Sequence, residues 1–215
     1  MKLKPTTKIS TMLMAAAVLS FSITACNSKG PDSKDAADSA NNAKAKTTDS
    51  ANHAMVSTTD SASSSNKKGY KDDAHFVVDA ADGGAYEIAA AQVALKNSSD
   101  KRVKEFASMM IKDHTKWGKE VAGYAKSKSI TVPDSLSNDK KDLVKKLSEK
   151  GNDKFDVKYM DNMKKDHKDD LDAFTDARKN TKDAALKTTL DKIIPGIQHH
   201  LMMATTLDSI IDKEK

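Results

Sequence analysis

The chain has 215 residues, of which 38% are hydrophobic, and a formal net charge of +5. Basic and acidic residues are interleaved along it, as in residues 164–170, and this pattern is typical of solvated helix faces. No basic stripe with interleaved aromatic residues occurs in the sequence. The composition therefore argues against nucleic acid as a partner.

Residues 1–25 are predicted to be a lipoprotein signal peptide. A lysine-rich start precedes the apolar residues 12–23, a stretch too short to span a bilayer comfortably. The stretch closes with Ile-Thr-Ala-Cys, ending at Cys26, and this sequence resembles the bacterial lipobox, whose cysteine is acylated and becomes the mature N-terminus. The alternative is an ordinary secretory signal with an incidental cysteine.

Cys26 is the only cysteine, so its acylation would consume the only thiol of the chain. The mature protein would then have no disulfide, no thiolate nucleophile and no cysteine ligand for a metal. Two or three acyl chains give stable membrane anchoring. Asn27 follows the cysteine in place of the aspartate that retains lipoproteins at the inner membrane, so we expect an anchor in the outer membrane, facing the periplasm.

Residues 26–71 are predicted to be a disordered tether. Ser, Ala, Asp, Asn, Lys and Thr dominate this segment, and Met55 and Val56 are its only sizeable apolar residues before Tyr70. Such a composition buries too little apolar surface to offset the entropy of an ordered chain. The remaining residues, 72–215, are enough for one domain with one core.

The domain is predicted to be all-α, because none of its segments shows the period-two alternation of a strand. Apolar spacing and capping residues predict four long helices and a short one. The long helices cover residues 73–96, 101–128, 153–179 and 182–212, and the short one covers residues 138–150. Pro195 lies inside the last long helix and is expected to kink it.

The connection between the second and third long helices, about 25 residues with the short helix inside it, indicates the topology. It is long for an antiparallel hairpin and is expected to cross the length of the bundle, as in ferritin-like folds. The two helices that it joins would then run parallel. We therefore expect a ferritin-like four-helix bundle with a long crossover that contains a short extra helix.

Each long helix carries one ionisable residue within its apolar stripe, where an apolar residue would be expected. These residues are Glu87, His114, His167 and His200. Burying a polar group without a partner costs roughly 2–7 kcal/mol. Four such residues from four helices therefore predict a polar site inside the bundle.

The same segments carry a resemblance to a known family. They are residues 76–87, 103–114, 155–167 and 194–201. In this order and spacing, after the lipobox and polar segment, they resemble the domain-of-unknown-function 4142 family of bacterial envelope proteins. Its members are often labelled as outer-membrane proteins and are regarded as ferritin-like. The resemblance covers about Asp72 to Leu207 and implies a four-helix bundle without an established activity.

A single transition-metal ion, held by the four stripe residues, is one hypothesis for the site. Imidazoles and a carboxylate suit Zn²⁺, Fe²⁺, Cu²⁺ or Ni²⁺. A ferritin di-iron centre needs Glu-x-x-His on two helices, but Ile111, Lys164 and Ile197 stand three residues before the histidines. Met110, Met163 and Met203 lie a turn from the histidines and would favour copper, although flexible filling of the core is the commoner role of methionine.

The other hypothesis is a buried hydrogen-bond cluster without metal, in which the histidines pair with Glu87, Tyr86, Tyr159, carbonyl groups or water. No nucleophile elbow, phosphate loop or His-Glu-x-x-His motif supports an enzyme. Two functions follow: a lipid-anchored bundle that binds a metal ion, or a non-catalytic structural or interaction module of the cell envelope.

Overall fold

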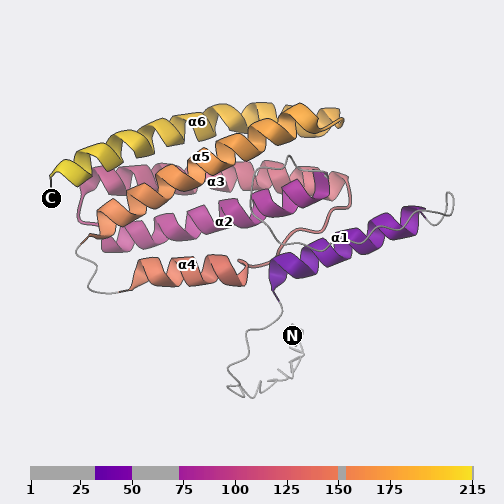
Figure 1. The fold of residues 1–215 in the computed structure, drawn as a ribbon, viewed down its shortest axis with the longest axis horizontal. Helices are drawn as coiled ribbons and strands as arrows, with labels where there is room; N and C mark the ends of the chain where they lie inside the picture. The colour runs from indigo at the N-terminus through magenta and orange to yellow at the C-terminus, as the bar shows by residue number, and fades with distance from the viewer. Residues whose placement is uncertain (1–31, 50–72, 150–153, 215) are drawn as a thin grey trace, which may run out of the picture.

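The computed structural model describes residues 32–49, 73–149 and 154–214, and all regular structure in these residues is α-helical (Figure 1). The helices are α1 (Ser33–Asp49), α2 (Asp73–Asn97), α3 (Lys101–Ser127), α4 (Asn138–Ser148), α5 (Phe155–Asn180) and α6 (Ala184–Lys213). The ends of α2 to α6 lie within two residues of the predicted positions. None of the described helices is long and apolar enough to cross a membrane.

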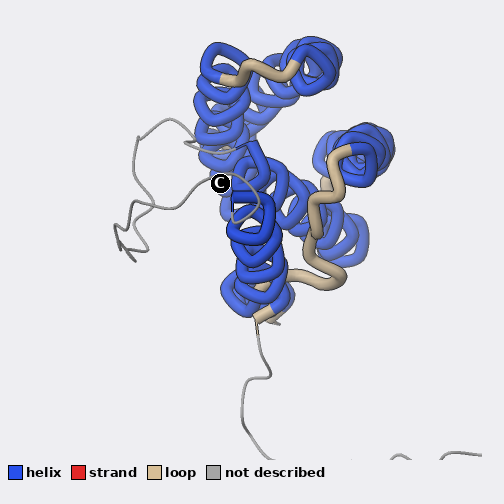
Figure 2. Tube along the Cα trace, turned by 90° about the vertical axis from the view of Figure 1, so that its right-hand side faces the viewer, coloured by secondary structure: helices blue, strands red, loops and turns tan. Residues whose placement is uncertain are grey.

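Helices α2, α3, α5 and α6 form a four-helix bundle. The chain packs α2 against α3 and α5 against α6, while contacts of α3 with α6 and of α2 with α5 join the two pairs (Figure 2). Helices α3 and α5 run in the same direction, because the connection between them returns along α2 through α4 (Figure 1). The predicted all-α bundle with a long crossover and a short extra helix is confirmed.

Side-chain caps fix where the helices begin. Asp100 accepts a hydrogen bond from the Arg102 amide at 2.7 Å, and Asp183 accepts from the amide of Leu186 at 3.0 Å, at the starts of α3 and α6. Ser137 caps α4, and the buried Asp82 of α2 accepts from both its amide (2.8 Å) and its hydroxyl (2.7 Å). These bonds attach the crossover to the bundle.

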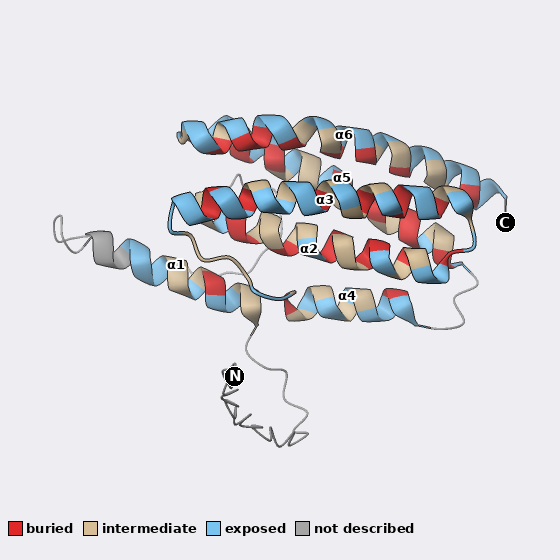
Figure 3. Ribbon diagram, turned by 180° about the vertical axis from the view of Figure 1, so that it is seen from behind, coloured by how far each residue is buried: buried red, intermediate tan, exposed pale blue. Residues whose placement is uncertain are grey.

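The apolar core forms two clusters along the bundle axis, on the inward faces of the helices (Figure 3). On α3 one cluster contains residues 103–110 and the other contains residues 121–125. On α6 the first of these clusters contains residues 204–211, and the second contains residues 186–197. The predicted site residues of these helices therefore lie in the layer between two apolar clusters.

The structure corrects the predicted disorder of residues 26–71 over α1. Ala37 is its one fully buried apolar side chain among those described, so apolar burial does not explain the helix. Polar contacts attach it: Asn41 donates to the Thr131 carbonyl at 2.9 Å and accepts from the Thr131 amide at 2.8 Å. Lys34 also forms an ion pair with Asp79 at 2.9 Å. The signal peptide, Cys26 and the rest of the predicted tether lie outside the described residues.

Replacing Asn41 with alanine is expected to loosen the crossover segment from α1, because the side-chain amide makes both hydrogen bonds to the Thr131 backbone. Hydrogen exchange at the Thr131 amide should accelerate by roughly tenfold, the equivalent of about one net hydrogen bond. Asn42→Ala is the matched control, since the neighbouring side chain is exposed. Equal protection in both variants would show that α1 is not held through Asn41.

Candidate metal centre

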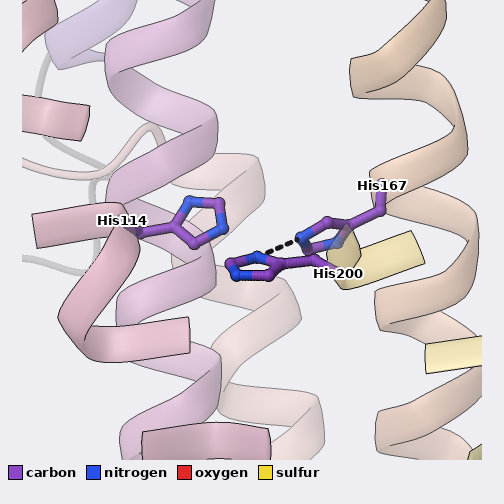
Figure 4. Close-up of side chains that lie close together, drawn as sticks. All are labelled: His114, His167 and His200. Carbon is purple, nitrogen blue, oxygen red and sulfur yellow. Dashed lines mark hydrogen bonds between the residues drawn. The ribbon is translucent and has the colours of Figure 1, made fainter. Parts of the chain in front are cut away.

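The four predicted site residues meet in the layer between the apolar clusters, each contributed by a different helix of the bundle. Glu87 on α2 and His114 on α3 are 2% and 4% exposed, and His167 on α5 and His200 on α6 are 0% exposed. The three imidazole rings point toward one another from α3, α5 and α6 (Figure 4). The structure thus brings the whole predicted set together.

Glu87 lies beside the Nδ1 atoms of two histidines. Its Oε2 is 2.9 Å from Nδ1 of His114, and its Oε1 is 3.2 Å from Nδ1 of His167. Neither oxygen accepts a well-aligned hydrogen bond, so these contacts are mainly electrostatic. Burial alone would raise the pKa of Glu87, but the charged forms of His114 and His167 lower it to about 2. Positive charge at these histidines, which a proton or a metal ion would supply, therefore favours the carboxylate form of Glu87.

The outward-facing nitrogens of the histidines all lie near acceptors. Nδ1 of His167 is 2.9 Å from the carbonyl oxygen of Met163, and Nε2 of His200 is 3.2 Å from Oδ2 of Asp113. Nδ1 of His114 has Glu87 beside it. A neutral imidazole carries one N–H and one lone pair, so we assign the protons to these outer nitrogens.

This assignment leaves lone pairs on the inner nitrogens. Nε2 of His167 and Nδ1 of His200 face each other at 3.3 Å (Figure 4). Nε2 of His114 is buried and has no hydrogen-bond partner. Two facing lone pairs repel unless a cation lies between them, so the cluster needs either a proton or an ion.

The histidine nitrogens converge on a common point, and the two that face each other at 3.3 Å have the spacing of ligands on one ion. A nitrogen from each of His114, His167 and His200 lies within 4.8 Å of those from the other two. Tetrahedral bonds of about 2.0–2.1 Å place neighbouring nitrogens about 3.3 Å apart. Glu87 is not in this group of converging atoms. Its position behind His114 is that of a carboxylate that orients a ligand.

Burial keeps two of the histidines neutral. It lowers the pKa of His200 to about 4, helped by the nearby charge of His114 and opposed by the hydrogen bond to Asp113. Burial also lowers the pKa of His167, which the negative charge of Glu87 opposes. Neutral imidazole is the form that binds transition metals.

Trp117 covers one side of the histidine cluster and was not among the predicted site residues. Its ring centroid lies 4.7 Å from that of His114 and 4.9 Å from that of His200. Gly196 provides the space for this ring, because a Cβ there would overlap Cζ2 of Trp117 and lie 2.7 Å from Cη2. Two features of the sequence could have indicated this contact: Gly196 lies one turn before His200, and Trp117, the only tryptophan, lies three residues after His114.

Gly196→Ala is expected to displace Trp117 and to lower the free energy of unfolding by roughly 1–3 kcal/mol, the usual cost of overpacking. Gly123→Ala on α3 is the matched control, because a Cβ there meets no atom within 4 Å. This control should gain roughly 0.5–1 kcal/mol from its lower chain entropy. Urea titrations followed by circular dichroism measure both. Equal gains in the two variants would contradict the packing of Trp117 on Gly196.

The three methionines near the histidines all pack in or against the apolar core. Met110 and Met163 are fully buried in the apolar cluster beside the site, and Met203 packs against it. Only the backbone carbonyl of Met163 contacts a site histidine through a hydrogen bond. The arrangement therefore favours imidazole nitrogens over thioether sulfur as ligands.

The chain matches a family model described as Domain of unknown function (DUF4142), over residues 57–207. This region includes α2 to α5 and most of α6, and it contains all four site residues. No curated protein matches the chain. No solved structure matches it either. The description of the family assigns no activity, so the function has to be argued from the site.

Proposed function

Because the chain belongs to the domain-of-unknown-function 4142 family, whose description names no activity, we propose a function from its buried site. The bundle binds one transition-metal ion through His114, His167 and His200. The convergence of three inner nitrogens, each on a ring whose outer nitrogen lies beside an acceptor, carries this proposal. Imidazole ligands suit Zn²⁺, Cu²⁺, Ni²⁺ or Fe²⁺.

The surroundings of the site favour storage, buffering or sensing of the ion over catalysis. The histidines are almost fully buried, and Trp117 covers two of them. No nucleophile or general-acid motif accompanies them in the sequence. Together with the predicted lipid on Cys26, this describes an envelope lipoprotein that holds a metal ion at the periplasmic face of the outer membrane.

The second candidate is a structural or interaction module of the envelope whose histidines form a metal-free cluster. The 3.3 Å contact between His167 and His200 favours it, because one shared proton would turn that contact into a hydrogen bond. This arrangement still leaves Nε2 of His114 without a hydrogen-bond partner, whereas an ion would bind it. Each unsatisfied buried group costs about 1–3 kcal/mol, so we prefer the ion.

The test is a titration of the chelator-treated full chain with Zn²⁺, Cu²⁺, Ni²⁺ and Fe²⁺. We expect one equivalent of at least one of these ions to bind and to raise the melting temperature. Protons compete for the imidazoles, so the affinity should fall as the pH drops from 6 toward 4, through the pKa of His200. Absence of stoichiometric binding for all four ions would leave the metal-free cluster as the function of these residues.

A further inference from the structure

A cavity of about 370 Å³ lies next to the histidine cluster. Helices α2 and α3 and the crossover form much of its wall, and α5 and α6 contribute the rest. Most of its lining is apolar and includes Ala81, Ile88, Phe174 and Ile193. A volume of this size with mainly apolar walls and few polar groups is typical of small-molecule sites.

Two ionisable side chains of the bundle interior line this cavity. His114 of the site lines it, and so does Asp170 of α5, one helical turn after His167. No hydrogen bond or ion pair between the described residues satisfies the carboxyl group of Asp170. Lys119, an exposed residue of α3, also lines the cavity. The cavity thus combines an apolar chamber with an unpaired acid.

The electrostatic surroundings of Asp170 are acidic. Burial, followed by the negative charges of Glu87 and Asp166, raises the pKa of Asp170 well above its ordinary value, and Lys140 opposes this only in part. Burial disfavours any isolated charge at this wall, but the neighbouring negative charges favour a cation over an anion, and an ammonium group beside Asp170 would stabilise its carboxylate form. An anionic ligand would meet the same repulsion.

We propose that this cavity binds a small apolar molecule that carries one protonated amine. The ammonium group pairs with Asp170, and the apolar body packs among Ala81, Ile88 and Phe174. This binding does not require the metal ion, because Asp170 and the apolar walls do not belong to the converging histidine nitrogens. Amine binding is therefore a second function of the bundle, at a site beside the proposed metal site.

The test uses Trp117, which lines the cavity and is the only tryptophan, as a fluorescent reporter. The full chain, kept in chelator, is titrated with phenethylamine, 2-phenylethanol and phenylacetate, which share a ring and differ in charge. Phenethylamine should bind about tenfold more tightly than the alcohol, as expected for a hydrogen bond to a charged group, and phenylacetate most weakly. Asp170→Asn should remove the preference for the amine, while the exposed neighbour variant Asp169→Asn should keep it.

Equal binding of the three probes, a preference for phenylacetate, no binding, or an unchanged preference in Asp170→Asn would each overturn the proposal. His200→Ala separates it from metal binding, because His200 does not line the cavity. That variant should lose the ion and still prefer phenethylamine. Loss of the amine preference in His200→Ala would show that the two sites are one, and would contradict an independent amine site.

Discussion

Replacing His200 with alanine is expected to abolish stoichiometric binding of the metal ion, whereas replacing its neighbour His199 is expected to leave binding unchanged. The ring of His200 is 0% exposed and its Nδ1 faces Nε2 of His167 at 3.3 Å. His199 is exposed and lies outside the converging group. Removing one of three ligands should weaken metal binding by roughly a hundredfold or more, because even the loss of a residue that hydrogen-bonds to a metal ligand typically lowers metal affinity by about 10–100-fold.

The measurement is a Zn²⁺ titration of both variants against a competing chelator, with the unfolding free energy measured in parallel. If the cluster holds no metal, His200→Ala should lower stability by about 1–3 kcal/mol, equally with and without added ion. Unchanged ion binding in His200→Ala would remove this residue from the ligand set. Equal loss in the His199 variant would instead indicate binding at the surface.

The helices and the crossover could be predicted because local signals and apolar spacing agree along this part of the chain. Asp100 and Asp183 have the capping chemistry that starts α3 and α6, and the structure uses both. The parallel arrangement of α3 and α5 followed from the length of their connection. Helix α1 could not be predicted in this way, because its contacts are polar and pair it with residues about 90 positions away, such as Asn41 with Thr131.

The residues of the site could be predicted from the sequence, but the orientation of their side chains could not. A histidine inside an apolar stripe is visible in the sequence, and the structure buries all three. The stripe does not show which ring nitrogen points inward, so Glu87 was grouped with the ligands although it lies beside outer nitrogens. Asp113 lies off the stripe of α3, yet its carboxylate reaches His200 across the bundle at 3.2 Å.

Cys26→Ser is expected to move the protein from the membrane fraction to the soluble fraction, because the predicted acyl chains are its membrane anchor. Asn27→Ala is the matched control and should stay with the membrane. Fractionation followed by immunoblotting measures both variants, and intact-mass spectrometry of the wild type should show the lipid on Cys26. An unacylated mature chain cut at another residue would contradict the anchor.

The same anchor would hold the bundle close to the membrane. Helix α1 begins at Ser33, seven residues after Cys26, and its polar contacts attach it to the crossover and to α2. Seven residues span at most about 25 Å when fully extended. The long tether predicted from composition would allow a longer reach. If α1 stays docked, a label on Ser33 of the lipidated protein should lie within that distance of the bilayer surface, and Asn41→Ala should let the bundle move farther away.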